Sequence, residues 1–368
     1  METTAYYAFG VPLYLGLVVA EWWRGKRRGR RILSFSTSFG NVSAGLGSIV
    51  VGLFLGPVLL ALYAWAHRHF ALVEWRSGSV VPWLLAIVLA DFGHYWHHRL
   101  DHRVAACWAV HGVHHMPEEM NFTVAMRHAW FSDLYSFPFY APLPLLGVPP
   151  SHFFVATTLL SFHALITHSE HYDFPSFGVL VTPRSHVLHH ARNRPYVDTN
   201  YGAMLAVWDR LFGTSSRWDD ANPPEYGTHR GYATHDGALA QWVLWRDLLS
   251  AARRVPTLRE KLRVFFARPG WLPSSVELPP IAPPPPAVSL ARKVYVALQS
   301  LLTIGFSLYV FVLRDVHAWS FKVAAAFGIL VTMVSLGGLL DGRPRATRME
   351  TVRVLVVSIA AFVFRFLV

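Results

Sequence analysis

The chain has 368 residues, of which 53% are hydrophobic and only 15% are charged. This composition is too apolar for an ordinary soluble domain and is typical of a protein that crosses a membrane several times. The net charge of +11 would suit a nucleic-acid-binding protein. The basic residues flank apolar segments, however, as in the cytosolic loops of membrane proteins, so we expect no nucleic-acid partner. The single cysteine, Cys107, excludes an internal disulfide and a cysteine-ligated iron–sulfur cluster.

Several apolar segments approach the length of about 20 residues that a helix needs to cross a bilayer. In chain order they are residues 5–23, 39–66, 80–97, 130–147, 150–167, 294–313, 321–340 and 354–368. A proline-rich turn joins 130–147 to 150–167, which predicts a helical hairpin that enters and leaves the membrane on the same side. The basic stretches 25–31 and 343–348 are predicted to be cytosolic. Both termini are then outside, and every histidine cluster described below lies inside.

We predict an all-α polytopic membrane protein, in which a bundle of transmembrane helices carries a helical cytosolic cap with a histidine-rich site for two metal ions. The expected parts are N-terminal transmembrane helices (1–79), a catalytic region of membrane helices and cap (80–275), a proline-rich linker (276–292) and C-terminal transmembrane helices (293–368). The linker contains the sequence PPIAPPPP, which favours a stiff, extended chain.

Three histidine clusters stand at the edges of apolar segments. The first is His98 and His102, the second is His111, His114 and His115, and the third is His186, His189 and His190. Residues three or four apart share one face of a helix, so each cluster presents its imidazoles together. One such cluster could arise by chance among 20 histidines, but three favour a site for two metal ions. Imidazole suits iron, zinc, copper and nickel.

The order of the motifs HRLDH, HGVHH, THSE, HVLHH, YVDTNYG and WDRLFGT resembles the membrane fatty acid hydroxylase and sterol desaturase superfamily. The segments HHMPEEMNFTVAMR, EYGTHRGY and KLRVFFARPGWLP are similar to its alkylglycerol monooxygenase branch and that branch's bacterial relatives. The resemblance implies a di-iron centre, held by histidines, that hydroxylates a C–H bond of a lipid with O2. Arg103 stands where that branch usually has glutamate.

The same resemblance implies further site residues. His168, in the THSE motif, is expected to be a ninth metal ligand. Glu118 and Asn121 occupy matching places after the second cluster and are expected to be catalytic. Ligand histidines need hydrogen-bond acceptors around them. The expected residues of this surrounding layer are Asp91, His94, His171, Asp198 and Asp209.

We expect two iron ions, with zinc able to replace iron during expression. The sequence has no flavin, nicotinamide or haem-binding fingerprint, so the electrons are expected from a separate donor, with a tetrahydropterin as one candidate. The expected partners are a membrane lipid, O2 and that donor, and the oligomeric state is left open. We expect an integral membrane protein with a cytosolic active site, in the inner membrane of a bacterium or the endoplasmic reticulum of a eukaryote.

Other functions remain open at this point. A desaturase or hydroxylase acting on fatty acyl chains or sterols would use the same motifs. A metal transporter is disfavoured because only His94 and His163 fall inside apolar spans. A membrane metallohydrolase is disfavoured because catalytic zinc typically keeps three protein ligands.

Overall fold

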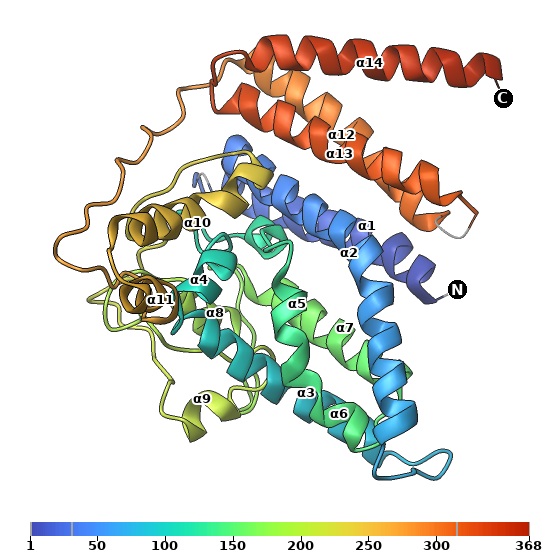
Figure 1. Ribbon diagram of the computed structural model, residues 1–368, viewed down its shortest axis with the longest axis vertical. Helices are drawn as coiled ribbons and strands as arrows, with labels where there is room; N and C mark the ends of the chain where they lie inside the picture. The colour runs from blue at the N-terminus through green and yellow to red at the C-terminus, as the bar shows by residue number, and fades with distance from the viewer. Residues whose placement is uncertain (1, 31, 314–315, 368) are drawn as a thin grey trace.

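The computed structural model describes residues 2–30, 32–313 and 316–367, and their regular secondary structure is helical apart from two isolated β-bridges. In chain order the elements are α1 (Glu2–Arg27), α2 (Phe35–Phe70), α3 (Val81–Asp101), α4 (Ala105–His111), the 3₁₀ segment η1 (Phe122–Met126), α5 (Ser132–Ser136), the 3₁₀ segment η2 (Phe137–Tyr140), α6 (Pro142–Leu145), α7 (Pro150–Thr167), α8 (Pro183–His189), α9 (Val207–Leu211), α10 (Gly237–Arg254), α11 (Leu258–Phe266), α12 (Leu290–Val312), α13 (Trp319–Leu340) and α14 (Ala346–Leu367) (Figure 1). The predicted all-α class is confirmed.

Three of the described helices, α2, α12 and α13, are long and apolar enough to cross a membrane. The chain is therefore an integral, multi-pass membrane protein. The predicted spans at 5–23, 80–97, 150–167 and 354–368 also fall on helices, namely α1, α3, α7 and α14. Arg31, Asp315 and Val368, which belong to predicted loops and spans, lie outside the described residues.

One predicted span differs from the structure. Residues 130–147 do not form a single helix but three short pieces, α5, η2 and α6. Pro138, Pro142 and Pro144 fall in these pieces, and proline removes a backbone donor and breaks a continuous helix. The returning limb, α7, is continuous. The hairpin thus has one broken limb and one regular limb.

The first half of α2 lies close to the segment that follows the second histidine cluster. A side chain at Gly45 would meet the Met126 carbonyl, and one at Gly47 would meet the Trp130 ring. The Trp130 indole N–H donates to the Ala44 carbonyl at 2.9 Å. Farther along, α2 contains Pro57 and changes direction in Figure 1. The glycines of α2 therefore permit a close approach of the chain that carries the histidines.

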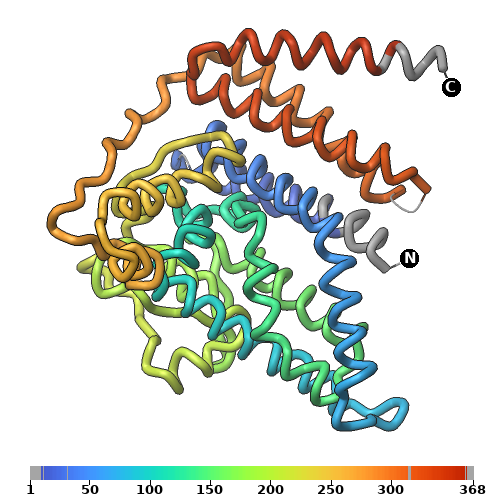
Figure 2. Tube along the Cα trace, viewed as in Figure 1, coloured from blue at the N-terminus to red at the C-terminus, as the bar shows by residue number. Residues whose placement is uncertain are grey.

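The C-terminal helices pack on the other side of α2. Phe39, Leu46 and Val50 of α2 share a buried apolar cluster with Met333 and Leu336 of α13. Figure 2 shows the preceding chain, coloured orange, passing along the outside of the molecule from α11 to α12. No helix forms in residues 271–289. The C-terminal helices are thus joined to the rest of the chain by an extended segment.

The cap is built on α10, which contacts both α4 and α2. Val243 and Leu244 of α10 pack with Ala109 of α4 and with Val113 in a buried cluster. Asp236 begins α10 by accepting hydrogen bonds from two backbone N–H groups, of Ala238 and Leu239. This packing fixes α4 and the turn after it, where the second histidine cluster lies.

Candidate metal centre

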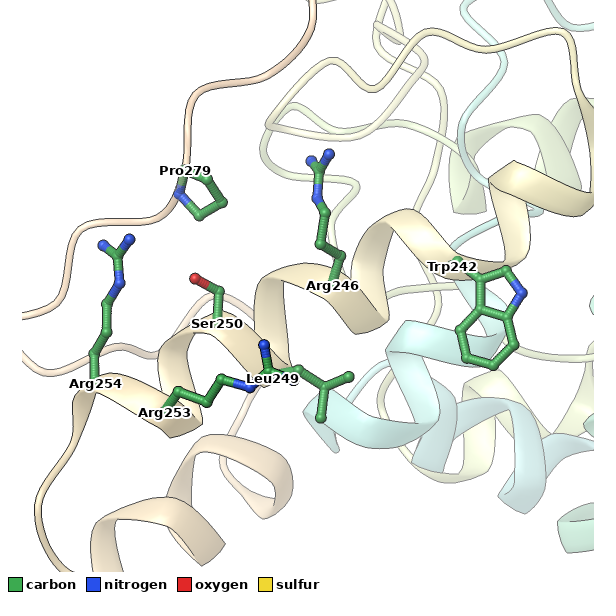
Figure 3. A pocket seen from close by; sticks show the side chains of 7 residues that line it. All are labelled: Trp242, Arg246, Leu249, Ser250, Arg253, Arg254 and Pro279. Carbon is green, nitrogen blue, oxygen red and sulfur yellow. The ribbon is translucent and has the colours of Figure 1, made fainter. Parts of the chain in front are cut away.

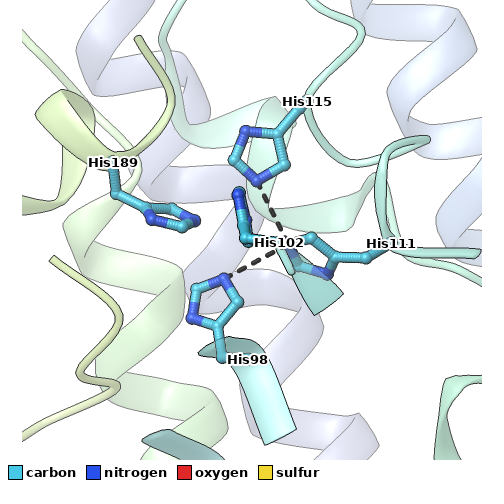
Figure 4. Close-up of side chains that lie close together, drawn as sticks. All are labelled: His98, His102, His111, His115 and His189. Carbon is cyan, nitrogen blue, oxygen red and sulfur yellow. Dashed lines mark hydrogen bonds between the residues drawn. The ribbon is translucent and has the colours of Figure 1, made fainter. Parts of the chain in front are cut away.

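The structure brings the histidines of all three clusters, and His168, into two adjacent groups. The five-histidine group is His98, His102, His111, His115 and His189, and the four-histidine group is His114, His168, His186 and His190. Within each group the candidate ligand atoms all lie within 4.8 Å of one another. Figure 4 shows the rings of the five-histidine group pointing toward one another from separate parts of the chain.

Each group draws on more than one helix. His98 lies near the end of α3 and His111 ends α4. His189 ends α8, and His168 directly follows α7. The two His–His pairs are divided between the groups, because His114 and His190 belong to one group and their neighbours His115 and His189 to the other. The clusters read from the sequence are therefore not the groups that form in space.

The distances between ring nitrogens fit metal coordination. His98 Nε2 lies 3.2 Å from His111 Nε2, which lies 3.1 Å from His115 Nε2. His168 Nε2 lies 3.0 Å from the Nε2 atoms of both His114 and His186. Two nitrogens bound at a right angle to an ion about 2.1 Å away are ~3 Å apart. Each group thus has the spacing of ligands around one ion.

Unsatisfied nitrogens point to the same conclusion. The Nε2 atoms of His102, His189 and His190 are buried and have no hydrogen-bond partner in the described structure. Buried polar atoms in proteins are nearly always bonded, so such orphaned atoms require an explanation. A bound ion would satisfy them, and the residues present therefore fit a pair of metal ions.

Burial also keeps the imidazoles in the form that binds metal. Removal from water lowers the pKa of His189 to about 4. It lowers the pKa of His111, His115 and His190 well below the usual value of 6.5. Burial disfavours the charged form of a base, so these rings are neutral at pH 7. A neutral imidazole offers the lone pair that a metal ligand needs.

Backbone carbonyls fix the orientation of several rings. The Nδ1 atoms of His98, His114 and His189 lie 2.9–3.0 Å from the carbonyl oxygens of Tyr201, Arg127 and Thr199. A ring that donates through Nδ1 keeps the lone pair of Nε2 free for an ion. The chain segments that follow the second and third clusters therefore orient the histidine rings and do not serve only as connections between helices.

Asp101 was missed by the sequence interpretation. It is fully buried, and its Oδ2 lies 3.5 Å from His111 Nδ1 and 3.4 Å from His97 Nε2. Its other oxygen accepts a hydrogen bond from the Tyr135 hydroxyl at 2.7 Å. A carboxylate beside a ligand histidine orients the ring and raises its basicity. The signal available in the sequence was the position of Asp101 inside HRLDH, four residues after His97.

Two of the carboxylates predicted to surround the ligands, Asp91 and Asp209, hydrogen-bond backbone groups of a loop and not the histidine rings. Asp91 accepts the backbone N–H groups of Met204 and Leu205 and the Trp208 indole N–H. Asp209 accepts the backbone N–H groups of Tyr201 and Gly202. Since the Tyr201 carbonyl meets His98, Asp209 supports that ring indirectly.

Asp198 and His94 each lie beside a residue that belongs to the first histidine motif or adjoins it. Asp198 Oδ2 lies 3.6 Å from Nε of Arg103, the residue directly after His102. The arginine that departs from the family pattern is therefore paired within the motif region. The His94 ring lies 5.3 Å from the His98 ring, measured between centroids, one helical turn before it. The role of these residues around the ligands stays a prediction.

Glu118, Asn121 and His171 belong to neither histidine group. Glu118 and His171 line a surface hollow together with Arg30 and Tyr226. Asn121 is fully buried, and its side chain bonds the Ile32 carbonyl and the Thr123 backbone N–H. The catalytic role expected for Glu118 and Asn121 stays a prediction, and the contacts of Asn121 are those of a residue that holds η1 in place.

His163 and a second hollow are also separate from the centre. His163 Nε2 lies 2.8 Å from the Val181 carbonyl. Figure 3 shows the second hollow, on the outer side of α10. It is lined by Trp242, Arg246, Leu249, Ser250, Arg253, Arg254 and Pro279, none of which belongs to either histidine group.

A helical membrane bundle with two adjoining groups of largely buried histidines fits the class of membrane metalloproteins that hold two metal ions. Comparison with known proteins places it more narrowly. A family model described as fatty acid hydroxylase matches residues 83–214, the stretch that contains all nine of these histidines. The chain belongs to the fatty acid hydroxylase superfamily and is an oxidoreductase.

The similar curated proteins include alkylglycerol monooxygenases. The chain is 30% identical to that of Danio rerio over 97% of its own length and 82% of the relative's. It is 30% identical to that of Homo sapiens over 96% of its own length and 82% of the relative's. The ornithine lipid hydroxylase OlsE of Rhizobium tropici is 32% identical over 43% of this chain and 46% of its own. No solved structure matches.

These relatives decide between the classes of function that the sequence left open. The chain is a lipid oxygenase of the fatty acid hydroxylase family, related to alkylglycerol monooxygenase. A metal transporter and a metallohydrolase are not supported by any of the family matches described.

Proposed function

We propose that the protein uses O2 to hydroxylate an alkylglycerol at the carbon next to the ether oxygen. The observation that carries this proposal is the extent of the similarity to alkylglycerol monooxygenase. It covers 97% of the chain, including the N-terminal and C-terminal helices that lie outside the family model. The match to the bacterial ornithine lipid hydroxylase covers only 43% of the chain.

In this proposal each histidine group holds one iron ion. Bound iron supplies the redox chemistry that O2 needs in order to attack an unactivated C–H bond. The chain's own contribution is to hold neutral nitrogen ligands in a buried place. Carbonyls of Tyr201, Arg127 and Thr199 orient the rings, and Asp101 orients His111.

The reaction inserts one oxygen atom of O2 into the C–H bond and releases the other as water, consuming two electrons and two protons. The product is a hemiacetal, which separates into a fatty aldehyde and a free glycerol lipid. We propose an external electron donor, a tetrahydropterin or a ferredoxin-type protein, because the sequence has no flavin or nicotinamide fingerprint. The lipid chain enters from the bilayer, and the centre faces the cytosol.

The test supplies purified, iron-loaded protein with an alkylglycerol, isotopically labelled O2, and either tetrahydropterin or a ferredoxin system. We expect fatty aldehyde together with labelled hydroxylated product trapped before it separates. The matched control is the His163→Ala protein, which should retain activity because His163 lies outside both groups.

The other outcomes separate the remaining candidates. A hydroxylated or unsaturated fatty acyl chain or sterol, with no aldehyde, would replace the ether substrate and keep the oxygenase class. Absence of O2 consumption with every lipid, while two irons per chain are bound, would overturn the proposed reaction.

A further inference from the structure

One fully buried carboxylate plays no part in the centre as described so far. Glu21 lies in α1, a helix whose surrounding sequence, LVVAEWW, is apolar. Its Oε1 accepts a hydrogen bond from the Ser169 hydroxyl, and its Oε2 accepts the Phe122 backbone N–H at 2.9 Å. Within the described residues Glu21 forms no ion pair. Each of its two buried oxygens therefore meets one hydrogen-bond donor.

Both partners of Glu21 belong to segments that carry candidate ligands. Ser169 directly follows His168 and is itself fully buried. Its hydroxyl oxygen also accepts the His171 backbone N–H at 3.1 Å. Phe122 begins η1, on the segment that leaves His114 and His115. A single side chain of the first helix thus joins the segments on which three of the histidines stand.

Other residues of the N-terminal region fasten the same segment. The Ser34 backbone N–H donates to Glu119 Oε2 at 2.9 Å. The Asn41 amide donates to Thr123 Oγ1, also at 2.9 Å. The Tyr14 hydroxyl donates to the Phe122 carbonyl at 3.4 Å. These contacts come from residues outside 83–214, the stretch that the family model matches.

We propose that Glu21 is a positioning residue for the four-histidine group, a role that rests on the two-metal site proposed above. Glu21 holds Ser169 and Phe122 at a fixed separation, and so places His168 opposite His114. A carboxylate is costly in an apolar helix, so its occurrence there calls for a specific role. Ligand geometry depends on the residues that support the ligands, so losing this support loosens the second ion.

The test compares Glu21→Ala with Glu21→Gln in the full-length protein purified in detergent. The measurements are iron per chain at limiting iron and the visible bands of cobalt(II)-substituted protein. Glu21→Ala loses both acceptors, and we expect one of the two ions to bind about tenfold more weakly. Glutamine still accepts the Phe122 N–H and donates to the Ser169 hydroxyl oxygen, so Glu21→Gln should keep both ions.

Val19→Ala is the matched control, because Val19 lies on the same helix and is 60% exposed. It should bind both ions as the unchanged protein does. If Glu21→Ala does not yield folded protein, Ser169→Ala decides, since it removes one of the two bonds and leaves Glu21 with Phe122. We expect a weaker loss of the same ion, and no further loss when Ser169→Ala is combined with Glu21→Gln.

Wild-type affinity for both ions in Glu21→Ala, or in Ser169→Ala where the first does not fold, would overturn the positioning role. Equal metal loss in Glu21→Ala and Glu21→Gln would do the same, because glutamine preserves the geometry. An unchanged protein that binds no iron would instead overturn the two-metal site itself, and the two failures are thereby distinguished.

Discussion

An imidazole ring has two nitrogens, and in this protein the surroundings of the ring decide which nitrogen faces the centre. The Nδ1 atom hydrogen-bonds a backbone carbonyl in His98, His114 and His189. Their Nε2 atoms are thereby left for an ion, in the tautomer that metal binding requires. Because the carbonyls belong to irregular segments, those segments have to be held in place as firmly as the ligands.

The first prediction concerns single ligands in the two groups. His189→Ala should lower the iron content of the five-histidine group and reduce the turnover rate by roughly a hundredfold or more. The substitution removes a buried nitrogen ligand, and only a water molecule could take its place. The iron content and O2 consumption of the purified protein check this. His163→Ala is the control, and unchanged iron and turnover in His189→Ala would contradict the assignment.

The second prediction concerns Asp101. Asp101→Asn replaces one carboxyl oxygen beside His111 by an amide nitrogen while keeping the shape of the side chain, so iron affinity or turnover should fall about 10- to 100-fold. Competition with a chelator measures the affinity. Asp247→Asn is a matched control, because Asp247 is also buried but pairs with Arg230 and Tyr232 away from the centre. Equal iron affinity in the two variants would refute the role of Asp101.

At the scale of single residues, the sequence predicts the candidate metal ligands better than it predicts the residues that hold those ligands in place. Ligand spacing is a local property of a helix, so it can be recognised in the sequence. Examples are His98 with His102, and His186 with His189 and His190. The roles of Asp101 and Glu21 cannot be recognised from local spacing. Asp101 meets His111 only after α3 and α4 pack together, and Glu21 meets Ser169 across 148 residues of chain.

At the scale of elements, the packing of α2 depends on two glycines that have no room for a side chain. A Cβ at Gly47 would lie 2.2 Å from the Trp130 ring, and a Cβ at Gly45 would lie 2.3 Å from the Met126 carbonyl. Such contacts force neighbouring groups to move. Gly45 and Gly47 therefore permit close packing of α2 against the chain that follows the second histidine cluster.

The third prediction tests this packing. Gly47→Ala should destabilise the folded protein by about 1–3 kcal/mol, because overpacking displaces the Trp130 ring. Gly52→Ala is the control, since nothing lies within 4 Å of its added Cβ, and it should stabilise the same helix by roughly 0.5–1 kcal/mol. Thermal unfolding in detergent compares the two. A rise in melting temperature for both variants would contradict the close contact.

The element predictions held where apolarity alone determines the structure. The predicted spans 294–313 and 321–340 correspond to α12 and α13, and the predicted ends differ from the observed ends by only a few residues. The segment 130–147 was apolar enough to resemble a span, but its prolines divide it into short pieces. Hydropathy reports burial in an apolar medium and says nothing of backbone hydrogen bonds, which proline interrupts.

At the scale of the whole molecule, the N-terminal helices and the cap are tied together. The sequence divided the chain at residue 79, and that division stays a prediction. Hydrogen bonds of Glu21 and Asn41 nevertheless join the N-terminal region to η1, and a hydrogen bond of Ser34 joins it to Glu119 just before η1. The apolar composition of the first two helices predicts membrane segments, and α2 is long and apolar enough to be one. Their polar contacts depend on tertiary structure and could not be predicted in this way.

The fourth prediction is the orientation of the chain in the membrane. On a Cys107→Ala background, a cysteine at Ser77 or Val316 should react with a membrane-impermeant thiol reagent added outside the cell. A cysteine at Arg348 should react only after the membrane is permeabilised, because basic loops remain on the cytosolic side. All three positions are exposed. Labelling of Arg348→Cys in intact cells would reverse the proposed orientation.

The division of the two His–His pairs between the groups has a consequence for the centre as a whole. His114 and His115 are joined by one peptide bond, as are His189 and His190, and each pair contributes one ring to each group. Consecutive Cα atoms are held about 3.8 Å apart. Two such covalent spacers, from the end of α8 and from the turn after α4, would set the gap between two bound ions. Because each spacer is a single peptide unit, the two histidine groups cannot move apart independently of each other.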